Sequence, residues 1–133
     1  MNWCEAWYFT PIPKEYHCKC LYVCDFCLNF FRNKKEFQRH SRCCTIRHPP
    51  GPEIYRSEVS KDEKEPQIAF FEVNGAFQNI YCENLSYISR MFLDHKNLEY
   101  SIECFFFYVM CKVEDDGYHF LGYFSKDRVR TEN

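Results

Sequence analysis

The sequence predicts an α+β fold in which a small, metal-stabilised ββα unit precedes a mainly antiparallel sheet with one helix. Three observations lead to this prediction. Cysteine and histidine recur with the spacing of metal ligands between residues 21 and 48. Two short turn motifs further along separate runs of aromatic and β-branched residues. Between these motifs, one segment carries apolar residues at helical spacing.

Composition points to a packed protein with reduced thiols. Of the 133 residues, 46% are hydrophobic and 20% are aromatic, which is enough for a buried core. Ten cysteines fit either a disulfide scaffold or a metal protein. The start has no basic flank or apolar run of a signal peptide, and no apolar stretch is long enough to span a membrane. We therefore expect an intracellular protein, and the net charge of −2 gives no global attraction to nucleic acid or membranes.

The chain divides into three predicted parts. Residues 1–20 form an extended arm in which two closely spaced prolines exclude a helix or a central strand. Residues 21–48 contain the metal pattern. Residues 49–133 form the sheet, and the Pro-Pro-Gly-Pro run at its start acts as a rigid joint.

The first half of the sheet part is expected to contain a hairpin and a helix. Asn74-Gly75 separates two strand-like runs, and such a pair is a strong hairpin signal because both turn positions favour positive φ. Apolar residues recur at helical spacing over roughly 83–93. The charged segment 57–66 is expected to be a solvated loop.

A second hairpin is predicted around Asp115-Asp116-Gly117, between strands at 104–113 and 118–125. The first of these strands is apolar on both faces, so we expect it in the middle of a covered sheet. Cysteines at 82, 104 and 111 fall in apolar patterns and are expected to be inert core thiols.

Four residues have the spacing of ligands in a structural zinc site: Cys24, Cys27, His40 and Cys44. A Cys-x-x-Cys knuckle places two thiolates on one turn, and residues at i and i+4 of a helix share one face. Two phenylalanines between the ligand pairs, at 31 and 37, supply the small apolar core that a ββα unit needs. Cys43 competes as the fourth ligand, but its neighbour is preferred because it lies at i+4 from the histidine.

The same predicted helix is basic. Six basic residues and one acidic residue lie between positions 32 and 48. These side chains either contact phosphates, with weak and nonspecific DNA binding, or form an ordinary solvated helix face. Base recognition is not expected, because one finger covers only about three base pairs. The candidate contacts are Lys34, Lys35, Arg39 and Arg42.

Several blocks of this sequence resemble MYST-type histone lysine acetyltransferases. The Cys-x-x-Cys block, the His-x-x-x-Cys pair and the His-Pro-Pro-Gly-Pro-Glu-Ile-Tyr-Arg run resemble the zinc-finger segment of that family. Further blocks follow in the same order, and the resemblance covers roughly residues 7–126. They lie at 71–75, 80–85, 91–96, 105–110 and 122–126.

The resemblance implies a zinc finger followed by the front part of an acetyltransferase domain, with an incomplete sheet. It implies zinc and acetyl-CoA as cofactors, chromatin as the partner, either histones in nucleosomes or a subunit of a chromatin complex, and a nuclear location without any membrane contact. Lys96 stands at the lysine of the Leu-Asp-His-Lys block, which is autoacetylated in the family.

The resemblance stops short of the family's catalytic segment. The active-site cysteine, the glycine-rich acetyl-CoA loop and the glutamate base follow the last matching block in the family, and none of the four glycines here lies in such a loop. We therefore expect no catalytic residue, no acetyl-CoA site and no acetyl transfer by this chain alone. Three interpretations remain open: an acetyltransferase by descent, a zinc-dependent chromatin or protein interaction module without catalysis, and a truncated product without function.

Overall fold

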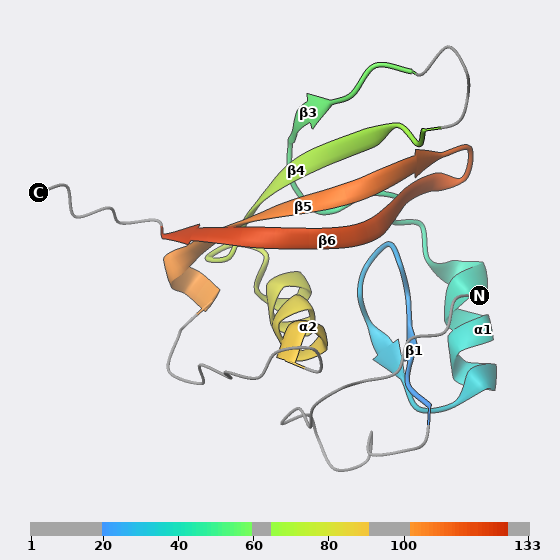
Figure 1. Ribbon diagram of the computed structural model, residues 1–133. Helices are drawn as coiled ribbons and strands as arrows, with labels where there is room; N and C mark the ends of the chain where they lie inside the picture. Colours follow the sequence, from blue (N-terminus) through green and yellow to red (C-terminus); the bar gives the residue numbers. More distant parts are fainter. Residues whose placement is uncertain (1–19, 60–64, 91–101, 128–133) are drawn as a thin grey trace, which may run out of the picture.

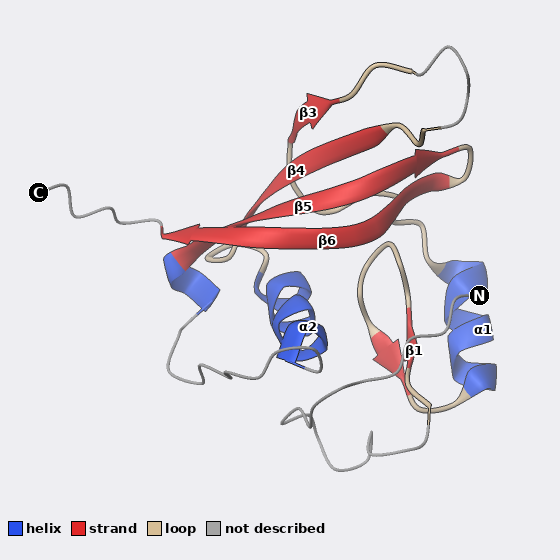
Figure 2. Cartoon of the chain, viewed as in Figure 1, coloured by secondary structure: helices blue, strands red, loops and turns tan. Residues whose placement is uncertain are grey.

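The computed structural model describes residues 20–59, 65–90 and 102–127. A two-stranded sheet and a helix form the first unit, and a four-stranded antiparallel sheet with one helix forms the second (Figure 1). Helix α2 and the first unit lie on the same side of the larger sheet (Figure 2). The α+β fold with an antiparallel sheet is therefore confirmed. Residues of the predicted arm before position 20 lie outside the described residues.

The first unit has the predicted ββα order. Strands β1 (Tyr22–Val23) and β2 (Phe30–Phe31) pair in antiparallel fashion, and helix α1 (Lys34–Cys43) follows directly. Asn33 caps this helix, because its side chain accepts a 2.8 Å hydrogen bond from the backbone N–H of Lys35. Helix α1 buries none of its residues, and its Phe37 packs on Tyr22 of β1 and Phe31 of β2.

The larger sheet has the strand order β3-β4-β5-β6. Its strands are β3 (Glu53–Arg56), β4 (Ile68–Asn74), β5 (Phe105–Glu114) and β6 (Gly117–Asp127), with the short 3-10 helix η2 (Ile102–Cys104) before β5. The predicted second hairpin is confirmed, since β5 and β6 pair in register around the turn that ends at Gly117. The bulge in this pair lies between Met110 and Cys111.

The predicted Asn74-Gly75 hairpin is wrong. After β4 the chain turns into helix α2 (Asn79–Arg90), and neither turn residue is among the described residues with positive φ. Gly75 is instead required by close packing, because a Cβ there would lie 2.0 Å from the carbonyl oxygen of Ile102. Its N–H also donates to the carbonyl of Phe105 at 3.0 Å. Tertiary contacts with the start of β5 therefore set this turn.

The hydrophobic core lies between one face of the sheet and the two elements packed on it. Alternate residues of β4 and β5 point inward and are almost fully buried, and α2 contributes one side of its surface. Leu28, from the first unit, is only 1% exposed and belongs to the same core cluster. The sheet and helix residues of the cluster are Ala69, Phe71, Val73, Tyr81, Cys82, Leu85, Phe107, Val109 and Cys111.

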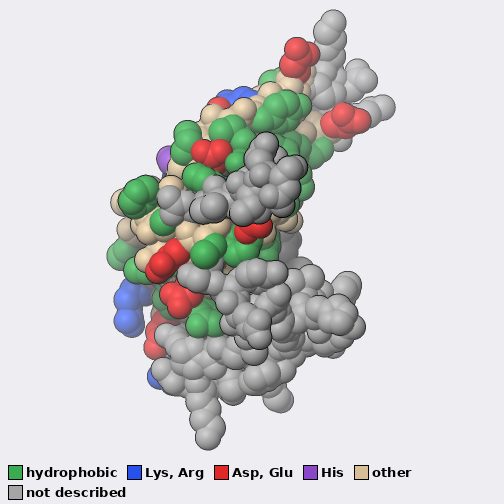
Figure 3. All heavy atoms as spheres, turned by 90° about the vertical axis from the view of Figure 1, so that its left-hand side faces the viewer, with side chains coloured by type: hydrophobic (Ala, Val, Ile, Leu, Met, Phe, Trp, Pro, Cys, Tyr) green, Lys and Arg blue, Asp and Glu red, His purple; other side chains and the backbone are tan. Residues whose placement is uncertain are grey.

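The opposite sheet face carries a line of aromatic rings. Phe70 contacts both Tyr55 and Phe124, and Phe124 stacks on Tyr108 with centroids 4.9 Å apart. Strand β5 lies between β4 and β6, as the sequence predicted for an inner strand. Its outer face is only half-buried at Tyr108 and Met110, so the described part of the chain does not cover both faces as predicted. Seen from the side on which β6 ends, hydrophobic side chains reach the surface among acidic ones (Figure 3). Within the described residues, no helix is long and apolar enough to cross a membrane.

Candidate metal centre

A tight knuckle turn after β1 positions two of the predicted metal ligands. The N–H of Cys24 donates to the carbonyl of Asn29, and the N–H of Leu28 donates to the carbonyl of Cys24, both at 2.9 Å. Cys24 and Cys27 are 5% and 6% exposed, so both thiols point into the structure. Leu28 closes the turn with a φ of +62°, a left-handed conformation that non-glycine residues seldom adopt.

Helix α1 supplies the other two predicted ligands. His40 lies in its last turn, and the N–H of Cys44 caps the helix by donating to the carbonyl of His40 at 2.8 Å. The Nε2 atom of His40 lies 3.3 Å from the Sγ atom of Cys27. One ligand atom from each of the four residues falls within 4.8 Å of all the others.

This arrangement fits a tetrahedral zinc ion. Zinc binds thiolate sulfur at about 2.3 Å and imidazole nitrogen at about 2.0–2.1 Å, so its ligands lie roughly 3.5 to 4 Å apart. Three sulfurs and one nitrogen within 4.8 Å meet that requirement with little adjustment. Four protein ligands complete the coordination and leave no open position, which is the pattern of a structural rather than a catalytic site.

The protonation of the knuckle also favours a metal. A hydrogen bond from the Cys27 thiol lowers the pKa of Cys24 despite burial. The same hydrogen bond, together with burial, raises the pKa of Cys27. One thiolate therefore forms readily between the pair, and a bound cation replaces the proton that the two sulfurs otherwise share.

Aromatic rings of the same unit pack against His40. The ring of Phe31 lies 4.8 Å from that of His40 and 6.2 Å from that of Phe37, and Tyr22 stacks on Phe37 at 5.8 Å. These are the two phenylalanines that the sequence predicted as the core of the unit. Cys43 is exposed and lies outside the four-ligand group, which favours Cys44 as the fourth ligand.

The remaining residues singled out by the sequence lie in different parts of the structure. Lys34, Lys35, Arg39 and Arg42 are all exposed on α1. Lys96 lies in the segment 91–101, outside the described residues. Cys82 and Cys111 are buried core thiols as predicted, and burial raises the pKa of each to about 12. Cys104 is exposed, so the prediction of a core thiol was wrong there.

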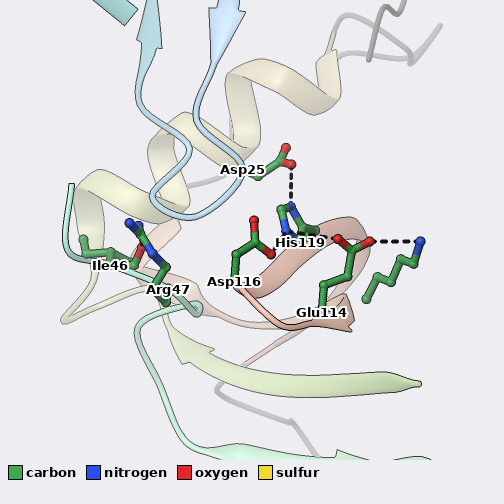
Figure 4. A network of polar contacts seen from close by, with 7 residues as sticks. Asp25, Ile46, Arg47, Glu114, Asp116 and His119 are labelled. Carbon is green, nitrogen blue, oxygen red and sulfur yellow. Dashed lines mark hydrogen bonds and ion pairs between the residues drawn. The ribbon is translucent and has the colours of Figure 1, made fainter. Parts of the chain in front are cut away.

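A polar junction that sequence reasoning missed joins the knuckle to the β5–β6 turn (Figure 4). The carbonyl of Arg47 accepts a 2.8 Å hydrogen bond from the N–H of Tyr118, and the Arg47 guanidinium lies 4.8 Å from the ring centre of Phe26. The Phe26 ring is 5.0 Å from that of His119. No local motif predicts the contacts that Tyr118 and His119 make here, because each joins segments more than seventy residues apart.

His119 is the charged centre of this junction. Its Nδ1 lies 3.0 Å from a carboxylate oxygen of Asp25, and its Nε2 lies 2.7 Å from one of Asp116. Partial burial lowers the pKa of His119, but hydrogen bonds and charge from the two carboxylates outweigh burial and raise it above 6.5. Glu114 lies 3.6 Å away and also pairs with Lys112 at 2.9 Å. Glu114, Asp116 and His119 lie close enough together to hold a metal ion, but ion pairs with His119 and Lys112 already account for the two carboxylates.

Two family models match consecutive parts of the chain. The model described as the MYST family zinc finger domain matches residues 3–44, and the model described as the MOZ/SAS family matches residues 48–133. The first match includes all four predicted ligands, and the second includes the whole four-stranded sheet.

Curated proteins from plants and fungi show the same relationship. Histone acetyltransferase of the MYST family 2 from Arabidopsis thaliana is 47% identical over 129 residues, which cover 96% of this chain and 27% of the relative. Histone acetyltransferase mst1 from Schizosaccharomyces pombe is 43% identical, with 97% and 26% covered. Histone acetyltransferase ESA1 from Mycosarcoma maydis is 46% identical, with 97% and 22% covered. The chain therefore spans about a quarter of the length of these relatives.

Proposed function

Since the chain belongs to the MYST, or MOZ/SAS, family, we propose that it is the zinc-finger and sheet portion of a histone lysine acetyltransferase that acts on chromatin in the nucleus. The observation that carries this proposal is the identity of 43–47% to proteins named histone acetyltransferases over almost the whole chain. Acetyl-CoA is then the acetyl donor of the family reaction. Lys96 remains the predicted site of autoacetylation.

The part of this function that the described residues can supply is a zinc-stabilised scaffold. We propose that Cys24, Cys27, His40 and Cys44 hold one structural zinc ion. The four donors converge within 4.8 Å, and the first two are buried. Such zinc sites contribute on the order of 10–16 kcal/mol of apparent binding energy in small finger peptides, so the ion is expected to be required for this unit to fold.

Metal analysis of the purified chain tests the zinc site. The wild-type protein should contain one zinc per chain, and Cys27→Ala or His40→Ala should lose it. Cys43→Ala provides the matched control, because its thiol is exposed and outside the group. Full zinc retention in Cys27→Ala and His40→Ala would contradict the assignment. Zinc loss in Cys43→Ala would show that Cys43, rather than Cys44, is the fourth ligand.

A second candidate function is a zinc-dependent chromatin or protein interaction module without catalysis. One observation favours it: Lys35, Arg39 and Arg42 recur at i, i+4 and i+7 of α1, on the side opposite Phe37 and His40. All three are exposed, so they present a basic stripe away from the metal. Phosphate contact by such a stripe gives weak binding without sequence preference, which falls steeply with salt.

Two assays on the zinc-loaded chain separate the two functions. Transfer of radiolabelled acetyl groups from acetyl-CoA to histone peptides would support the enzyme. Because this chain alone is not expected to transfer acetyl groups, lack of transfer does not decide between the two, and nucleosome binding that depends on the basic stripe would support the interaction module. Reversal of Arg39 and Arg42 to Glu should then weaken binding and reduce its salt dependence, whereas reversal of Arg90 and Lys126, with the same change in net charge, should not. Salt-insensitive binding would indicate that the stripe is only solvated.

A further inference from the structure

The side chain of Asn29 lies between a predicted zinc ligand and helix α2. Its Nδ2 atom is 3.3 Å from the Sγ atom of Cys27, and its Oδ1 atom accepts a 2.9 Å hydrogen bond from Nδ2 of Asn84. Asn84 lies on α2, fifty-five residues further along the chain. A short chain of two amides therefore connects the metal centre to the helix on the sheet.

The chemistry of a metal-bound thiolate fixes the direction of both hydrogen bonds. A thiolate can only accept, so the amide nitrogen of Asn29 must face Cys27. The amide oxygen of Asn29 then faces away, and Asn84 must present its own nitrogen to it. The orientation found in the structure is the one that places a donor at each step toward the sulfur.

Hydrogen bonds and packing hold both amides of this pair in place. The backbone carbonyl of Asn29 accepts the N–H of Cys24, so one residue contacts both cysteines of the knuckle. Next to Asn84 on α2, Leu85 is 0% exposed and anchors the helix in the core. The neighbouring residues Phe30 and Tyr87 meet edge to face with centroids 6.3 Å apart. The two amides are thus kept in line by packing on either side.

We propose that Asn29 and Asn84 form a two-amide relay through which helix α2 holds the zinc-bound thiolate of Cys27, so that Asn84 is a positioning residue of the metal centre. The relay rests on the zinc site proposed above. Groups that orient metal ligands in this way commonly change metal affinity by about 10- to 100-fold when they are replaced. The hydrogen bond withdraws charge from the sulfur, which opposes protonation of the thiolate and loss of the ion.

Two substitutions at one position distinguish the relay from simple packing. In Asn84→Ala, Asn29 keeps its donor on the sulfur, and water can replace the lost partner at this half-buried position. In Asn84→Asp the new carboxylate only accepts, so the Asn29 amide turns its nitrogen toward it and its oxygen toward the thiolate. Zinc loss should therefore be slowest in the wild type, faster in Asn84→Ala, and about 10-fold faster than wild type or more in Asn84→Asp. A packing role predicts the reverse order for the two variants, because Asp has the shape of Asn.

The experiment uses the zinc-loaded 133-residue chain and measures zinc release to a chromogenic chelator. Asn79→Asp is the control, because it makes the same chemical change at the exposed first residue of the same helix. A second readout is the sulfur-to-metal charge-transfer band of the cobalt-substituted protein. This band should move to lower energy in Asn84→Asp and in Asn29→Ala, and Asn84→Asp should add nothing in the Asn29→Ala background.

The outcomes separate the relay from the zinc site itself. If the wild type holds less than one zinc, the site fails and the relay fails with it. If the wild type holds one zinc but Asn84→Asp releases it at the wild-type rate, or more slowly than Asn84→Ala, the relay alone is wrong. An unchanged cobalt band in both Asn84→Asp and Asn29→Ala would also exclude it, since a lost hydrogen bond must alter the energy of the sulfur electrons.

Discussion

Replacing Gly117 by alanine should pull the β5–β6 turn away from the zinc knuckle. Gly117 has a φ of +143°, and a Cβ built there would lie 2.8 Å from Cε1 of Phe26 and 2.9 Å from the carbonyl oxygen of Arg47. The phenylalanine ring can move aside, but the Arg47 carbonyl is backbone and already accepts the N–H of Tyr118. The new methyl group can therefore be accommodated only if the turn shifts as a whole.

The expected cost follows from two contributions. A side chain at a positive-φ position costs about 1–2 kcal/mol, and an extra methyl group in a packed contact costs about 1–3 kcal/mol. The free energy of unfolding should thus fall by about 2 to 5 kcal/mol. Gly122→Ala is the matched control, because nothing lies within 4 Å of its Cβ position on the same strand. It should leave stability unchanged or raise it by up to about 1 kcal/mol.

Urea unfolding of the zinc-loaded protein, followed by far-ultraviolet circular dichroism, measures both variants. Amide hydrogen exchange provides a local readout. The N–H of Tyr118 should exchange faster in Gly117→Ala than in the wild type, and at the wild-type rate in Gly122→Ala. If the two variants unfold within about 0.5 kcal/mol of each other, the turn does not pack on the knuckle as described.

Three further predictions concern the core and the junction. Leu28→Ala should lower the free energy of unfolding by about 2–5 kcal/mol in urea titrations, because the side chain is 1% exposed in the shared core, and a loss below 1 kcal/mol would contradict that burial. Tyr81→Phe should leave the melting temperature unchanged or raise it, because the buried hydroxyl has no hydrogen-bond partner among the described residues, and a clear decrease would reveal one. His119 has a raised pKa in the folded state, so its contribution to stability is complete below pH 6.5 and is lost as pH rises through the folded pKa. Between about pH 6 and pH 8 the melting temperature of the wild type should therefore fall more than that of His119→Gln, and parallel curves would exclude this ion pairing.

Local chemistry determined what the sequence could predict. The zinc unit was predicted from ligand and phenylalanine spacing, because so short a segment has few other ways to bury its apolar residues. The β5–β6 hairpin was predicted because its turn needs a residue with positive φ, which Gly117 provides. In both cases the decisive interactions lie within about twenty residues of one another along the chain.

Long-range packing explains what the sequence could not predict. The Asn74-Gly75 motif carries a hairpin signal, but the carbonyl oxygens of Ile102 and Phe105 approach Gly75 and fix a different turn. The spacing of residues along the sequence also does not predict the contact between Asn29 and Asn84 or the junction around His119. Asn29 and Asn84 are fifty-five residues apart, and His119 and Asp25 are ninety-four residues apart. Only the fold shows that these polar residues meet.

These long-range contacts imply that the zinc unit and the sheet fold as one body. An isolated zinc unit would have to expose Leu28, which sits in a strained left-handed conformation directly after Cys27 and gains compensation from the shared core. The same knuckle reaches α2 through Asn29 and reaches the β5–β6 turn through Phe26. Metal binding by the four proposed ligands would order the knuckle, and the knuckle forms part of the surface on which the sheet packs. We therefore expect the binding energy of zinc to stabilise the sheet as well as the finger, so that replacing a single proposed ligand weakens contacts far from the ion.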